Sequence, residues 1–250
     1  MKHHGLLHEN STYLISYPRS GANWLRYCVE NITEQITLGV KPAALGCDPL
    51  TPLDNSVEFA IQKLLNEEMI TGRKANQVPI MQHSHRWFCA HSTTRILFLI
   101  RNPKEAILRD LRGTIGSDQK VKQCIQHNPI WVLITPDGIC DYASLAKRYV
   151  EHTGPKHIVY YEDLKSNPEE TLIECTKFLT GTDTTKNVKS FMEKFSYHNE
   201  RSVKIYTKGS TNNTLHSDQF MSESDKKRWD KYLIKNHPTI VPVVERYFEK

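Results

Sequence analysis

Four short, almost wholly apolar runs are separated along this sequence by longer segments with helical signals. The runs are Thr12–Ser16, Pro79–Gln82, Arg95–Ile100 and His157–Tyr161. Strands that are buried on both faces of a parallel sheet have this character, and their alternation with helices is typical of the α/β class. We therefore predict one α/β domain over residues 1–250, with a central parallel sheet of about five strands flanked by helices.

Helix starts are marked by capping residues. Residues 102–105 (NPKE) supply an N-cap, a proline at the first helical position and a glutamate at the third, which predicts a helix Pro103–Arg112 that ends at Gly113. Residues 167–170 (NPEE) repeat the device, and residues 222–225 (SESD) mark a third start. The polar stretch 196–219 is predicted to be an irregular surface segment.

Charge and composition restrict where the protein works. The formal net charge is +5 with 12 His, which indicates an anionic ligand without naming one. No run approaches the roughly 20 apolar residues of a membrane span, and Met1–Asn10 lacks the apolar core of a secretory leader. The 6 Cys are scattered, as reduced thiols are, so we expect a cytoplasmic protein that does not bind a membrane.

The run Thr12–Ser16 leads directly into a loop and a helix start that carry anion-binding groups. Residues 17–26 read YPRSGANWLR, and apolar residues continue beyond them with helical spacing. The start of such a helix presents free backbone N–H groups and the positive end of the helix dipole. Gly21 lets the backbone approach a ligand, Ser20 adds a hydroxyl donor and Arg19 adds a guanidinium. The pattern predicts a phosphate or sulfate site.

Three blocks of sequence carry a family resemblance. No G-x-x-x-x-G-K-[ST] loop occurs, which disfavours an ordinary P-loop kinase or NTPase. Residues 17–26 instead resemble the 5′-phosphosulfate loop of sulfotransferases that use 3′-phosphoadenosine 5′-phosphosulfate (PAPS). Residues 98–105 (FLIRNPKE) are similar to the 3′-phosphate motif of that family, and residues 160–164 (YYEDL) to its Y-E-D-L segment. The blocks follow in the family's order over roughly Tyr13 to Tyr232, and the resemblance implies a P-loop-like domain.

The same resemblance implies PAPS as co-substrate and 3′-phosphoadenosine 5′-phosphate (PAP) as product. Trp24 matches the ring that stacks on adenine and Tyr161 the ring near the adenine edge, with plain core packing as the alternative for both. Arg101 matches the 3′-phosphate arginine. Arg109 stands where the family usually has a serine, and either contacts the same phosphate or is solvated. The implied cofactor-binding set is Arg19, Ser20, Gly21, Ala22, Asn23, Trp24, Arg101, Arg109, Tyr161, Lys208 and Gly209.

A general base is expected at the end of the strand in residues 79–86 (PIMQHSHR). His is the natural base near neutral pH, and two histidines two residues apart on a strand point to the same face. Compared with the family's K-[ST]-H pattern, His85 is the base, while His83 replaces the lysine and acts as a cation only when protonated. Arg19 is expected to stabilise charge rather than to donate a proton. Two alternatives remain: a zinc site of His83, His85, Cys89 and His91, or plain structural histidines.

We therefore predict a metal-independent sulfotransferase that moves a sulfuryl group from PAPS to a hydroxyl or amine of a small-molecule acceptor. The alternatives are a nucleotide or small-metabolite kinase and a non-catalytic module that binds 3′-phosphoadenosine nucleotides. The positive charge is expected to be local to the cofactor site, so no nucleic-acid partner is predicted. The sequence makes no prediction of the acceptor's identity or of the oligomeric state.

Overall fold

A five-stranded parallel sheet forms the centre of the computed structural model, which describes residues 12–35, 37–39, 80–85, 87, 93–127, 141–194 and 217–249. All neighbouring strands pair in parallel, in the order β2-β3-β1-β4-β5. The strands are β1 Thr12–Ser16, β2 Thr37–Gly39, β3 Met81–Ser84, β4 Arg95–Ile100 and β5 Lys156–Tyr160. The predicted fold class and strand number are confirmed.

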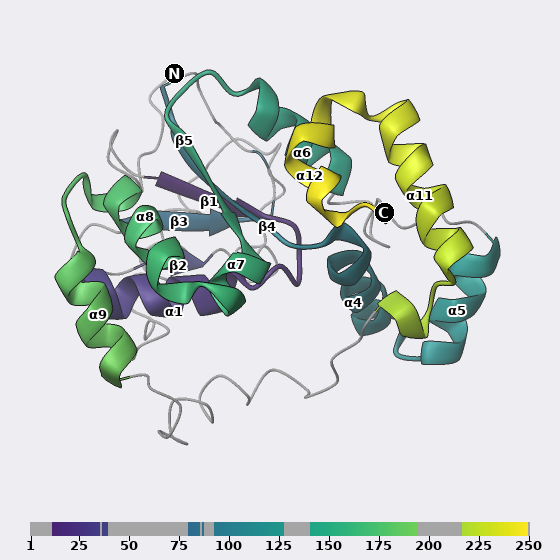
Figure 1. Cartoon of the computed structure of the whole chain (residues 1–250), viewed down its shortest axis with the longest axis horizontal. Helices are drawn as coiled ribbons and strands as arrows, with labels where there is room; N and C mark the ends of the chain where they lie inside the picture. The colour runs from purple at the N-terminus through teal and green to yellow at the C-terminus, as the bar shows by residue number, and fades with distance from the viewer. Residues whose placement is uncertain are drawn as a thin grey trace, which may run out of the picture.

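Helices lie on both sides of this sheet (Figure 1). The α-helices are α1 Ala22–Thr33, α4 Pro103–Ile115, α5 Asp118–His127, α6 Tyr142–Glu151, α7 Tyr161–Ser166, α8 Pro168–Thr180, α9 Thr185–Lys194, α11 Glu223–Asn236 and α12 Val241–Val244. Three short 3₁₀ turns are also described, namely η2 Ser217–Gln219, η3 Pro238–Ile240 and η4 Glu245–Tyr247. None of the helices in the described part of the chain has the length and apolar character needed to cross a membrane.

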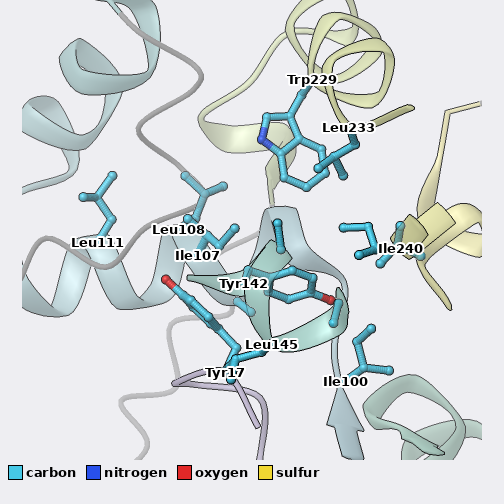
Figure 2. Packing of buried hydrophobic residues seen from close by; sticks show 14 of the residues in the cluster. Tyr17, Ile100, Ile107, Leu108, Leu111, Tyr142, Leu145, Trp229, Leu233 and Ile240 are labelled. Carbon is cyan, nitrogen blue, oxygen red and sulfur yellow. The ribbon is translucent and has the colours of Figure 1, made fainter. Parts of the chain in front are cut away.

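Alternate residues of the strands enter two separate cores. Leu97 and Leu99 of β4 pack with α1, α8 and α9, whereas Phe98 and Ile100 pack with α4, α6 and α11. Figure 2 shows the second core, where Trp229 of α11 extends toward Tyr142 of α6. Because both faces are covered, the strands read as continuous apolar runs in the sequence.

Several element boundaries differ from the sequence prediction. Strand β3 lies two residues later than expected, and β5 ends at Tyr160 because Tyr161 begins helix α7. The prediction that Gly113 ends α4 was wrong: the helix continues to Ile115 and ends at Gly116, which has a positive φ of 72°. Gly116 adopts the left-handed conformation that favours glycine after a helix, and Gly113 stays in the helix interior.

The predicted helix starts are correct. Asn102 caps α4 through its side chain, which accepts a hydrogen bond from the Lys104 N–H, and Pro103 is the first helical residue. Ser222 and Asp225 form a reciprocal capping box at the start of α11. Helix α8 also begins at its predicted proline, Pro168. Of the polar stretch 196–219, only residues 217–219 lie within the described residues.

Candidate active site

The candidate residues gather at the carboxyl edge of the sheet. The parallel strands β1, β3, β4 and β5 end there, and each is followed by one block of the predicted site. Loops at this edge of an open parallel sheet are where α/β proteins bind their ligands. The fold therefore brings together residues that are far apart in the sequence.

The loop after β1 has a backbone that few sequences can adopt. Arg19 has a positive φ of 64° and Gly21 one of 99°. A Cβ atom at Gly21 would lie 2.6 Å from Cδ2 of Tyr161, so the ring of Tyr161 requires glycine beneath it. Gly21 is also the N-cap of α1, and its carbonyl accepts from the N–H groups of Trp24 and Leu25. This geometry leaves the first N–H groups of α1 facing the loop.

Both predicted histidines contact Ser16, the last residue of β1. Nε2 of His83 lies 3.0 Å from Ser16 Oγ, and Nδ1 of His85 lies 2.8 Å from the Ser16 carbonyl oxygen. Their ring centroids are 4.5 Å apart in an edge-to-face arrangement. Although β3 ends at Ser84, the two rings therefore share one side, as predicted.

The contact with Ser16 fixes the tautomer of His85. A carbonyl oxygen only accepts, so Nδ1 of His85 carries the hydrogen and Nε2 of the neutral ring carries the lone pair. Burial lowers the pKa of His85 below its ordinary 6.5, the bond to Ser16 raises it, and the charge of Arg19 lowers it again. His85 is thus a neutral base at neutral pH.

His83 is buried more deeply than His85. Burial lowers its pKa well below 6.5, and the neighbouring His85 and the charge of Arg26 lower it further. Its ring is therefore uncharged at neutral pH.

Arg19, Arg101 and Arg109 form a cluster of three guanidinium groups. Arg101 donates from Nη1 to the Arg19 carbonyl at 3.2 Å, and its Cζ lies 4.1 Å from the ring centroid of Tyr161. Burial lowers the pKa of Arg109, the charge of Arg101 lowers it further, Glu105 and Tyr161 raise it, and Arg19 again lowers it. Arg109 stands where the family usually has a serine, and its guanidinium is close enough to Arg101 and Arg19 for their charges to lower its pKa.

Three buried donor atoms of the loop and the arginine cluster could bind an anion. Nε of Arg101, Nε of Arg109 and Oγ of Ser20 are buried, and no hydrogen-bond partner for them lies among the described residues. Buried polar atoms are normally hydrogen-bonded, because leaving one unsatisfied costs about 1–3 kcal/mol. An oxyanion with several oxygens would satisfy such donors, and guanidinium groups are suited to it.

The predicted adenine-contacting rings are neighbours. Trp24 and Tyr161 meet edge to face with centroids 5.7 Å apart, at the start of α1 and the start of α7. Both rings are partly buried, and both pack against the core that contains Leu97 and Leu99.

Two residues near the site escaped the sequence reasoning. Ser16 positions both histidines, but nothing in a strand's last residue marks that role. Gly113 supports Arg19: a Cβ added at Gly113 would lie 3.0 Å from Arg19 Nη2 and 3.7 Å from its Cζ. The sequence signal for this contact was a glycine one turn after Arg109 in a predicted helix, since glycine in a helix interior often allows a close approach.

Some predicted residues lie outside the described residues. These are Lys208 and Gly209, together with Cys89 and His91 of the zinc alternative. Across the ranges that the structure describes, no group of three or more His, Cys, Asp or Glu side chains is arranged to hold a metal ion.

Comparison with known proteins identifies the family. A sequence profile of the sulfotransferase domain matches residues 9–241. The chain belongs to the sulfotransferase domain family. A WSCD family member from Aedes aegypti is 23% identical to this chain over 177 residues, which cover 67% of this chain and 50% of that protein. The chain thus spans about half the length of this curated relative.

Two solved structures are similar to this chain. A sulfotransferase from Alicyclobacillus acidocaldarius has a TM-score of 0.50 at 14% identity, covering 94% of this chain and 95% of that chain. The mouse sulfotransferase SULT7A1 complexed with PAP has a TM-score of 0.46 at 17% identity, covering 96% and 90% of the two chains. The first likeness confirms the sulfotransferase fold of this chain.

Proposed function

We propose that this protein transfers a sulfuryl group from PAPS to a hydroxyl or amine of a small-molecule acceptor. The proposal is carried by three buried donor atoms, on Ser20, Arg101 and Arg109, for which the described residues offer no hydrogen-bond partner, together with the neutral His85 at the carboxyl edge of the sheet. PAPS carries anionic phosphate and sulfate groups that would satisfy those donors, and it supplies the sulfuryl group.

Two parts of the site would hold the two ends of this co-substrate. The 5′-phosphosulfate would be bound by the loop of Arg19, Ser20 and Gly21 and by the first N–H groups of α1, at Ala22 and Asn23. The 3′-phosphate would be bound by Arg101 and Arg109. The family resemblance adds Lys208 and Gly209 as further contacts. Trp24 and Tyr161 offer rings for the adenine.

His85 is the proposed general base. Its Nε2 lone pair accepts the proton of the acceptor hydroxyl or amine while the acceptor atom bonds to sulfur. The bond between sulfur and the phosphate oxygen breaks, and its electron pair leaves on that phosphate. Arg19 stabilises the developing negative charge, because a guanidinium stays protonated and is matched to oxyanions.

His83 contributes to this site as a neutral group. The sequence assigned it a cationic role that requires protonation, and its lowered pKa makes that form scarce at neutral pH. We propose that Arg19 supplies the positive charge beside the phosphosulfate instead and that His83 holds the Ser16 hydroxyl. The proposed reaction uses the Arg19 guanidinium and the first N–H groups of α1 for charge stabilisation, without a metal ion.

Binding and turnover together test the proposal. Calorimetric titration is expected to show binding of PAP and none of ATP with Mg²⁺. Transfer of radiolabelled sulfate from PAPS to a library of small alcohols, phenols and amines then measures turnover. Binding of ATP with Mg²⁺ in preference to PAP would favour the kinase, and PAP binding without transfer would favour a binding module.

The base is tested by one substitution and one control. His85→Ala is expected to lower kcat by about 10²–10⁴-fold with PAP affinity retained. His237→Ala is the matched control, because His237 packs beside Tyr232 at the end of α11. Turnover close to that of the wild type in His85→Ala would assign the base to another residue, with His83 the next candidate.

A further inference from the structure

The peptide group that joins Arg101 to Asn102 is held at both of its polar atoms. The Arg101 carbonyl accepts from the Tyr142 hydroxyl at 2.9 Å. The Asn102 N–H donates to Oε1 of Glu162 at 3.0 Å. Rotation of this peptide would break both bonds, so the backbone that carries the Arg101 side chain has one orientation. We call this peptide and its two partners the Arg101 mount.

Glu162 is in turn held by a residue far along the chain. The Tyr247 hydroxyl donates to the other carboxylate oxygen, Oε2, at 2.6 Å. Burial raises the pKa of Tyr247, and the negative charge of Glu162 raises it further, so the hydroxyl keeps the proton that it donates. The Tyr247 carbonyl accepts from Lys104 Nζ at 3.0 Å. Tyr247 is therefore fixed at its backbone as well as at its ring.

The adjacent residues make a second link of a different kind. Arg246 forms a bidentate pair with Asp163, at 2.6 and 2.8 Å. This pair joins the same two segments as the Tyr247–Glu162 bond, but within the described part of the chain neither of its hydrogen bonds involves the Arg101 mount. It is also more exposed, with side-chain exposures of 40% and 36%. Arg246 Cζ also lies 5.7 Å from the Tyr247 ring centroid, so Arg246→Met removes the ion pair and this ring contact but leaves the Tyr247–Glu162 bond, which makes it a control for general loosening.

We propose that Glu162 and Tyr247 are positioning residues that fix the Arg101 guanidinium for the 3′-phosphate. The inference rests on the proposed function for its ligand. Neither residue needs to touch the co-substrate: Glu162 holds the backbone of Asn102, and Tyr247 keeps the Glu162 carboxylate from rotating away. A displaced guanidinium would weaken the contact with one phosphate group only.

The two substitutions Tyr247→Phe and Glu162→Ala test this role. Loss of one hydrogen bond from Tyr247→Phe is expected to raise the Kd for PAP and the KM for PAPS by about 5–10-fold. The KM for the acceptor should stay the same. Glu162→Ala, which loses both bonds, should weaken PAP more, and Glu162→Gln should recover part of the loss because its amide oxygen still accepts from Asn102.

A second readout does not depend on any ligand. Hydrogen exchange of the Asn102 amide should speed up in Tyr247→Phe and in Glu162→Ala, and should be unchanged in Arg246→Met. PAP affinity should likewise be unchanged in Arg246→Met. Equal weakening of PAP in Tyr247→Phe and Arg246→Met would overturn the proposal, because general loosening would then explain it.

The two proposals fail in different ways. If the wild-type protein does not bind PAP, the proposed function fails, and unchanged Asn102 exchange in Tyr247→Phe would independently refute the mount. If the wild type binds PAP and Tyr247→Phe binds it equally well, the positioning role is wrong and the proposed function stands.

Discussion

Gly113 has no side chain, and this leaves space for the Arg19 guanidinium against helix α4. An added Cβ would lie 3.0 Å from Arg19 Nη2, the mobile end of a long side chain, so the guanidinium would move and the helix would not. Alanine in a helix interior is also more stable than glycine there, by about 0.5–1 kcal/mol of folding free energy. Gly113→Ala is therefore expected to raise the free energy of unfolding while it lowers kcat with PAPS. Urea unfolding and sulfate transfer measure the two effects.

Gly116 supplies the control for this prediction. No atom of the described residues lies within 4 Å of the Cβ that alanine would add there, but its φ of 72° strains any residue with a side chain. Gly116→Ala should therefore lower stability by about 1 kcal/mol and leave kcat unchanged. If Gly113→Ala kept full turnover, Arg19 would not need that place for the reaction.

His83 gives the protein a predictable response to pH. Its pKa is well below 6.5 in the folded state because the ring is buried, whereas the unfolded chain binds the proton near 6.5. The unfolded state therefore holds more protons below that pH, and stability rises with pH through this window and is lost as pH falls. From pH 7 to pH 5.5 this residue should remove about 1 kcal/mol of stability.

Urea unfolding of the wild type and of His83→Gln at the two pH values measures this effect. The substitution removes the titrating group, so the variant should lose about 1 kcal/mol less than the wild type between pH 7 and pH 5.5. Equal losses in both proteins would show that the ring titrates normally in the folded state.

Sequence patterns predicted elements well where local signals decide them. Strands β1 and β4 have their predicted bounds, since each is an apolar run that ends at a turn signal. The start of α4 was also correct because Asn102 and Pro103 define it locally. Its end was wrong, because Gly113 resembles a C-cap in the sequence and serves a contact with Arg19 that only the tertiary structure creates.

The candidate site shows the same division. His83, His85, Arg101, Arg109 and Tyr161 were all named from motifs, and the fold brings them to one edge of the sheet. Their partners were not predictable, because the bonds join residues far apart in sequence. The Ser16–His83 pair spans 67 positions and the Glu162–Tyr247 pair spans 85. No periodicity or spacing within a short window carries that information.

At the scale of the whole molecule, a buried lysine joins three distant parts of the chain. Lys104 Nζ lies 2.8 Å from Oδ1 of Asp230 in α11 and 3.1 Å from Oε1 of Glu249, and it donates to the Tyr247 carbonyl. The Glu249 N–H in turn donates to the second oxygen of Asp230, at 2.8 Å. The side chains of Lys104 and Asp230 are only 1% and 7% exposed. The single domain over residues 1–250 stays a prediction. The Lys104 contacts are of the kind that a single domain requires, because they join segments far apart in the chain.

Removal of the lysine charge is expected to be costly. Lys104→Met leaves the Asp230 carboxylate buried without its cation, which should lower the free energy of unfolding by about 3–5 kcal/mol. Arg228→Met breaks an ion pair with Asp225 whose side chains are 58% and 27% exposed, and it should cost no more than about 1 kcal/mol. Chemical denaturation of both variants measures the difference.

A double substitution separates charge from packing in this contact. If the unpaired carboxylate causes the loss, Lys104→Met combined with Asp230→Asn should be more stable than Lys104→Met, because no buried charge is then left at position 230. If the double variant is no more stable, the contact of the lysine ammonium with the Trp229 ring is the greater contribution, since Nζ lies 5.7 Å from that ring centroid. Comparable small losses in Lys104→Met and Arg228→Met would contradict the prediction, and α4, α11 and residues 247–249 would then be held together by their apolar contacts.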